Sequence, residues 1–143
     1  MISMPWTLET IHPLFVHFPI ALFSTGLLID ILSRFWESHK EELDSVGFWI
    51  MGVALLSSVF TALTGIIAYI QQSQFSYFLH FNHGILAILS MIIFSLLFWV
   101  RIDFQLELRH SIIKQNIYLI IQILSTSILF YSAHLGAIAA ERI

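Results

Sequence analysis

The chain has no cysteine and very few charged side chains. Without cysteine, disulfides, thiolate metal sites and thiol catalysis are excluded. Charged residues make up 10% of the 143 residues, against about a quarter in ordinary soluble proteins. Hydrophobic residues make up 58%, and the mean hydropathy is +0.87. A soluble protein of this size has too little interior to bury so much apolar surface, so the composition predicts a membrane protein.

Three stretches of the chain carry no charged side chain, namely residues 10–29, 45–100 and 115–140. A helix needs roughly 20 apolar residues to cross a bilayer core of about 30 Å. The middle stretch is long enough for two crossings and a turn, which gives four crossings in all. We therefore predict an all-α membrane protein, a four-helix transmembrane bundle that forms one domain over residues 1–143. The predicted spans are approximately residues 14–35, 46–71, 79–100 and 117–139.

The basic residues are concentrated on one side of the predicted membrane. Five of the six Lys and Arg residues follow the first span or join the third to the fourth, and Arg142 alone lies on the other side. Loops rich in Lys and Arg stay in the cytoplasm. This pattern predicts a bacterial inner-membrane protein with both termini on the periplasmic side.

A weak internal repeat relates the two halves of the chain. The dipeptides His-Phe at 17–18 and Phe-Trp at 35–36 recur 63 residues later. Two parallel helix hairpins related by an axis normal to the membrane would produce such a repeat. Coincidence in a chain rich in phenylalanine explains it equally well.

Most of the seven histidines fall near one face of the predicted membrane. His39 and His110 lie in the charged loops, where we expect them to be solvated. The others lie at the starts of spans one and three and at the end of span four, which the topology brings to the outer face. These are His12, His17, His80, His83 and His134.

Ionisable side chains inside a membrane point to function, and imidazole is the commonest protein ligand to metals and an axial ligand of haem iron. No carboxylate lies at the same depth, so the cluster fits haem b, copper or zinc better than magnesium or calcium. A bis-histidine haem takes its ligands from different helices. We therefore place His17 and His80 first as the ligand pair, with His134 next, His12 at the rim, and His83 as a substitute for His80 if span three is rotated.

Catalysis by the protein itself has little support in the sequence. Asp30, at the far end of span one, lies a membrane width from the histidines, so no serine triad can form. Phosphate-binding loops, the metalloprotease HExxH pattern and basic nucleic-acid patches are also missing.

The segment IHPLFVHFPI at residues 11–20 resembles the opening motif of a bacterial four-span membrane family called domain of unknown function 2231 (DUF2231). That family carries an HxxxG element at the third span, which His80 and Gly84 match. It also carries a GHLGG-like element in the fourth span, which HLG at 134–136 matches, although alanines replace the flanking glycines.

The resemblance implies that His12, His17, His80 and His134 are site residues, whereas His83 is not carried over. Some relatives occur beside or fused to c-type cytochrome modules, which implies redox partners. The replaced glycines leave the close packing around His134 in question.

The sequence thus leads to a functional hypothesis with two alternatives. We expect a small membrane protein that binds haem b, or alternatively copper or zinc, and transfers electrons as a subunit of a larger redox complex rather than as an independent enzyme. Its expected partners are the lipid bilayer, c-type cytochrome or respiratory-complex subunits, and a second copy of itself. The first alternative is a structural or assembly subunit without a cofactor, and the second is a metal or proton conduit.

Overall fold

The structure, a computed structural model, describes residues 8–71, 82–104, 108 and 110–139. Its elements are α1 (Leu8–Phe35), the short 3₁₀ helix η1 (Glu37–His39), α2 (Lys40–Gln71), α3 (Asn82–Asp103) and α5 (Ile112–Ala139). The four α-helices are long and apolar enough to cross a membrane, which confirms the prediction of an all-α, four-span fold. Helices α1, α2 and α5 begin several residues before the predicted spans. Hydropathy marks the apolar part of a helix, and these helices continue beyond it.

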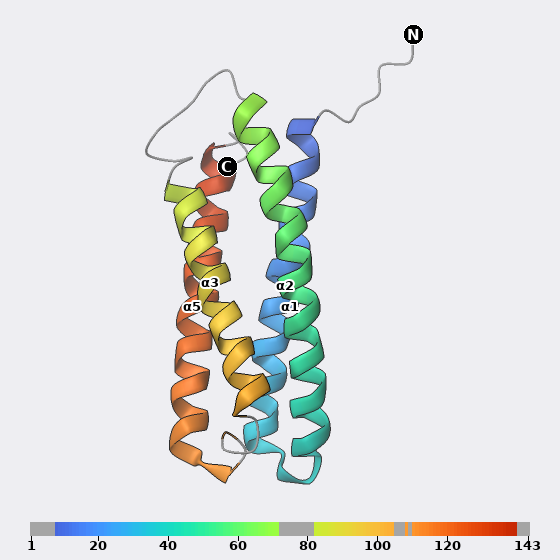
Figure 1. The fold of residues 1–143 in the computed structure, drawn as a ribbon, viewed down its shortest axis with the longest axis vertical. Coiled ribbons are helices and arrows are strands. Elements are labelled where there is room, and N and C mark those ends of the chain that lie inside the picture. Colours follow the sequence, from blue (N-terminus) through green and yellow to red (C-terminus); the bar gives the residue numbers. More distant parts are fainter. Residues whose placement is uncertain (1–7, 72–81, 105–107, 109, 140–143) are drawn as a thin grey trace.

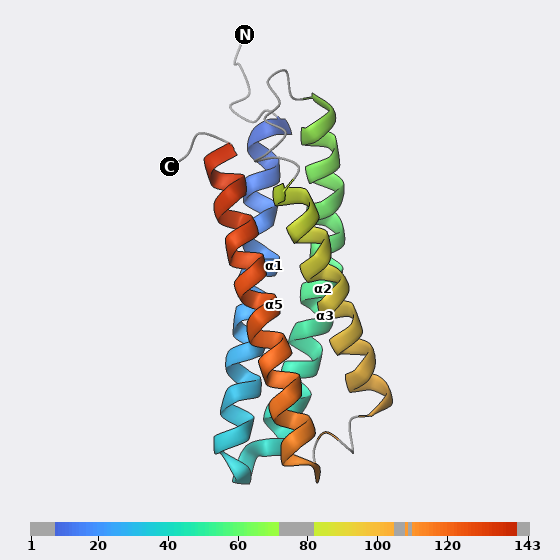
Figure 2. The same cartoon turned by 90° about the vertical axis from the view of Figure 1, so that its left-hand side faces the viewer.

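The helices form two antiparallel hairpins that pack side by side. Helix α1 pairs with α2, and α3 pairs with α5 (Figure 1). In the two views together, α1 lies diagonally across the bundle from α3, and α2 lies diagonally across from α5 (Figures 1 and 2). The start of α1 and the end of α5 lie at the same end of the bundle (Figure 1).

We call this end the histidine end, because it carries His12 and His83. The opposite end carries Asp30 and Arg101, and we call it the charged end.

Two prolines lie inside α1, and a neighbouring helix compensates for one of them. Helix α1 begins at Leu8, so Pro13 and Pro19 are both interior. Pro19 has no N–H to donate to the carbonyl of Phe15 four residues earlier. The Thr61 hydroxyl of α2 donates to that carbonyl at 3.1 Å. This contact satisfies a backbone group that lipid could not.

The interior of the bundle combines one apolar layer with several polar side chains. In the centre, the rings of Phe23 and Phe94 stack with their centroids 3.8 Å apart and their planes 13° apart. Ser90, Gln122 and Ser125 are fully buried, whereas large apolar side chains cover the outer faces of the helices. Buried polar side chains between helices are typical of bundles surrounded by lipid. Among the described residues, the Ser90 hydroxyl and the side-chain carbonyl oxygen of Gln122 have no hydrogen-bond partner.

Candidate functional site

At the histidine end, imidazoles from the two hairpins lie close together. The ring centroids of His12 on α1 and His83 on α3 are 6.4 Å apart, and the ring planes meet at 66°. Both side chains are half-buried. The helices that carry them are diagonal neighbours, so this pair lies between the hairpins rather than within one of them (Figures 1 and 2).

Each imidazole is held by the second helix of its own hairpin. His12 Nδ1 lies 3.1 Å from the Thr64 hydroxyl of α2, and His83 Nδ1 lies 2.8 Å from the Ser132 carbonyl oxygen of α5. A carbonyl can only accept a hydrogen bond, so Nδ1 of His83 carries the proton. In the neutral ring, Nε2 is then the nitrogen with the lone pair, as in histidines that bind metals through Nε2.

Two glycines make room for these rings. A Cβ atom at Gly65 of α2 would lie 2.9 Å from Cε1 of His12, and one at Gly136 of α5 would lie 2.8 Å from Cε1 of His83. Both distances are shorter than real Cβ contacts, so any larger residue would displace the ring. Gly84 is different, since a Cβ there would meet no atom within 4 Å.

The remaining predicted site residues are not part of this pair. His17 is exposed, and its Nδ1 lies 2.6 Å from the carbonyl oxygen of Pro13 on the same helix. His134 is also exposed, and His80 lies outside the described residues. In the loops, His39 is exposed beside Glu42 and His110 is exposed. Within the part of the chain that the structure describes, no group of three or more His, Asp or Glu side chains could hold a metal ion.

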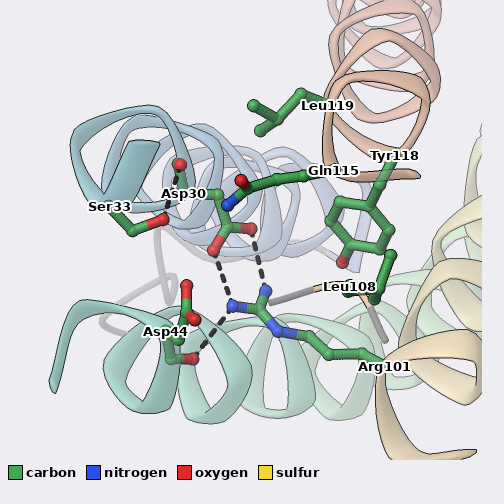
Figure 3. A pocket seen from close by; sticks show the side chains of 8 residues that line it. All are labelled: Asp30, Ser33, Asp44, Arg101, Leu108, Gln115, Tyr118 and Leu119. Atoms are coloured by element: carbon green, nitrogen blue, oxygen red, sulfur yellow. Dashed lines mark hydrogen bonds and ion pairs between the residues drawn. The ribbon is translucent and has the colours of Figure 1, made fainter. Parts of the chain in front are cut away.

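The charged end contains a buried ion pair that joins the two hairpins. Arg101 of α3 donates to both carboxylate oxygens of Asp30 on α1, at 2.8 and 2.7 Å (Figure 3). It also donates to the backbone carbonyl of Asp44 on α2 at 2.9 Å. Asp30 is 4% exposed and Arg101 is 5% exposed. Such bidentate, charge-assisted contacts have a defined geometry as well as a favourable energy.

Other polar groups complete this cluster. Gln122 of α5 donates through Nε2 to Asp30 at 3.0 Å, and the Arg101 guanidinium lies 5.8 Å from the centre of the Tyr118 ring. The Tyr118 hydroxyl donates to the sulfur of Met51 at 3.6 Å. A cavity of about 30 Å³ beside the ion pair has room for a water molecule.

This cluster was not predicted from the sequence, in which Asp30 and Arg101 mark the ends of uncharged stretches. The sequence does contain a signal for it. Asp30 lies near the end of the first span and Arg101 at the end of the third, and these two ends are on the same side of the membrane. A buried charge inside a membrane needs a partner, and each is the natural partner of the other.

A family model described as "Predicted membrane protein (DUF2231)" matches residues 8–143. No curated protein and no solved structure matches the chain. The matched range includes all four helices, the histidine pair and the charged cluster.

Proposed function

The chain belongs to the DUF2231 family of predicted membrane proteins, and from this premise we propose that it binds a histidine-ligated cofactor at His12 and His83 and transfers electrons. Haem b is the first candidate, and copper or zinc is the alternative. The observation that carries the proposal is the approach of two imidazoles from different hairpins to 6.4 Å. The proposed pair replaces the pair that we expected from the sequence, because the side chain of His17 is exposed.

Two imidazoles supply the axial ligands of a haem, whereas copper or zinc would need further ligands, and the described residues offer no group of three. A metal ion between two imidazoles needs two nitrogen–metal bonds of about 2.0–2.1 Å. If the two bonds are in line, their lengths and the distance from each bonding nitrogen to its ring centre add up to about the 6.4 Å that separates the ring centroids. The Nδ1 contacts with Thr64 and Ser132 orient the rings, and Gly65 and Gly136 accommodate them.

When bound, haem b or copper would supply one-electron chemistry. The four residues that hold the imidazoles would set their orientation, and the surrounding helices would limit access of water to the site. Electron transfer at such a site would need a partner that supplies the electrons. We propose c-type cytochrome or respiratory-complex subunits in that role.

Purified protein that has been expressed with haem and metals supplied should show a Soret band or a stoichiometric metal ion. His12→Ala or His83→Ala should remove it, because either change removes a ligand. His39→Ala, in an exposed loop position, should leave it unchanged. His17→Ala is the discriminating variant on the same helix, and it should also retain the cofactor.

Loss of the cofactor in His17→Ala but not in His12→Ala would restore the pair expected from the sequence. A wild-type protein that is colourless and free of metal would refute cofactor binding. The alternative function, a structural or assembly subunit, would then account better for the buried contacts between the hairpins.

We further propose that the histidine end faces the periplasm of a bacterial inner membrane, on the basis of the asymmetry of Lys and Arg. A reporter fused at Lys40 or Lys114 should behave as cytoplasmic, and one fused after Ile143 should behave as periplasmic. The opposite pattern of reporter activity would place the histidine pair at the cytoplasmic face.

A further inference from the structure

Three pairs of side chains meet between α1 and α3, one at each end of the bundle and one near its centre. They are His12 with His83, Phe23 with Phe94, and Asp30 with Arg101. In each of the three pairs the two residues are 71 positions apart in the sequence. One constant spacing therefore relates the inward-facing positions of α1 to those of α3.

The same spacing relates α2 to α5. Gly65 and Gly136 each accommodate an imidazole of their own hairpin. Met51 and Gln122 are both buried, as are Ala54 and Ser125. Among the described residues, the spacing of 63 suggested by the recurring dipeptides does not connect side chains that meet. When the two hairpins are aligned by their buried positions rather than by identical residues, the offset between them is 71 residues.

We propose that the hairpin α3–α5 is a second copy of the hairpin α1–α2, related to it by an approximate two-fold axis along the bundle, and that the Asp30–Arg101 pair makes each hairpin specific for the other. The diagonal positions of α1 and α3, and of α2 and α5, are those that a two-fold axis requires (Figures 1 and 2). This inference does not depend on whether the histidines bind a cofactor.

A two-fold pairing of identical hairpins would place like residues opposite each other. Two buried carboxylates, or two guanidinium groups, would then repel each other across the axis. With Asp30 in one hairpin and Arg101 in the other, the unlike pairing alone is favourable. The interaction surface of α1 thus fits a hairpin of the same design that carries arginine at the equivalent position, and it rejects a second α1–α2 hairpin.

The contacts of the ion pair give this proposal a strict test. Arg101 donates to the carbonyl of Asp44, whose counterpart 71 residues later is Gln115, which lines the same cavity. Under the two-fold relation, an arginine at position 30 would find the carbonyl of Gln115 as its third acceptor. Gln122, which donates to Asp30, has Met51 as its counterpart.

The experiment exchanges these residues in the full-length chain. Asp30→Arg alone and Arg101→Asp alone should each lose most of the folded, monodisperse protein in detergent, by about tenfold or more. The double exchange should recover at least half of the wild-type yield. Adding Met51→Gln and Gln122→Met, which moves the amide donor as well, should bring the melting temperature closer to that of the wild type.

A double exchange no better than the single variants would overturn the proposal, since a two-fold surface must accept the reversed pair. A fourfold exchange less stable than the double one would also count against it.

Cross-linking tests the register without altering the charges. Because the chain has no cysteine, His83→Cys can be combined with His12→Cys, at a spacing of 71, or with Ile20→Cys, at a spacing of 63; all three side chains are partly exposed. A short bis-maleimide applied in membranes should link the first pair within one chain and leave the second pair unlinked. Linkage of the second pair, or failure of the first, would refute the register.

Discussion

Replacing Arg101 with alanine should destabilise the protein by about 3–5 kcal/mol, because the carboxylate of Asp30 would remain buried without its partner. Asp30 is 4% exposed, so its carboxylate has little contact with bulk water. Gln122 would remain as a donor, but one neutral amide does not compensate a charge. The measurement is the free energy of unfolding in detergent micelles, or the melting temperature where unfolding is irreversible.

Two controls separate this effect from a general effect of removing an arginine. Arg34→Ala removes the same side chain at the same end of the bundle, but its contact with Asn116 is exposed, at 3.3 Å. That change should cost less than about 1 kcal/mol. The double variant Asp30→Ala with Arg101→Ala should be more stable than Arg101→Ala alone, because no unpaired charge remains. Equal losses of stability in Arg34→Ala and Arg101→Ala would show that the buried ion pair stabilises the protein no more than an exposed contact does.

Replacing Gly136 with alanine should lower stability by about 1–3 kcal/mol and displace the His83 ring. Alanine favours a helix over glycine by roughly 0.5–1 kcal/mol, so helix propensity alone predicts the opposite sign. The loss comes from the added Cβ, which would lie 2.8 Å from Cε1 of His83. The ring would have to move away from the Ser132 carbonyl that orients it. Thermal melting and the cofactor content of the purified protein report the two consequences.

Gly84→Ala is the matched control on α3, because a Cβ at that position meets nothing within 4 Å. It should be neutral or slightly stabilising. Combining Gly136→Ala with His83→Ala should remove most of the cost of the glycine substitution, since the clash no longer exists. If Gly136→Ala is as harmless as Gly84→Ala, the ring of His83 does not depend on the glycine for its position.

The sequence allowed the helices to be predicted well, because the signal for a span is long and simple. Stretches of 20, 26 and 56 residues without a charge fix the number of crossings almost regardless of detail. Each helix extends past its predicted span at one end or both, since polar residues at the ends continue the helix outside the apolar layer. These differences do not affect the arrangement of the hairpins.

The sequence predicted a group of histidines at one end of the bundle, but not which two of them form the pair. Depth along a helix follows from counting residues, but rotation about the helix axis does not. At about 3.6 residues per turn, His12 and His17 point roughly 140° apart. One can face the opposite hairpin only if the other turns away, and it is His12 that approaches His83 while His17 is exposed. Neither the family motif nor the repeat of dipeptides contains that information.

The charged cluster was missed for a different reason. From the sequence, Asp30 was placed near the far end of span one and Arg101 just after span three, and neither was given a partner. Both lie inside the bundle, held by contacts among four helices that no single segment reveals. An ionisable residue at the edge of a span can belong either to the loop or to the core, and its partner on another span decides between them.

The separation of the two charges along the chain also affects how the protein is made. At 5–20 residues per second, a ribosome needs roughly 4–14 s to proceed from Asp30 to Arg101. During that interval the first hairpin lacks the guanidinium of Arg101, the partner of Asp30 in the folded bundle. The ion pair forms only when α3 joins the bundle, so the first hairpin gains the stability of this contact only after the second hairpin has been made.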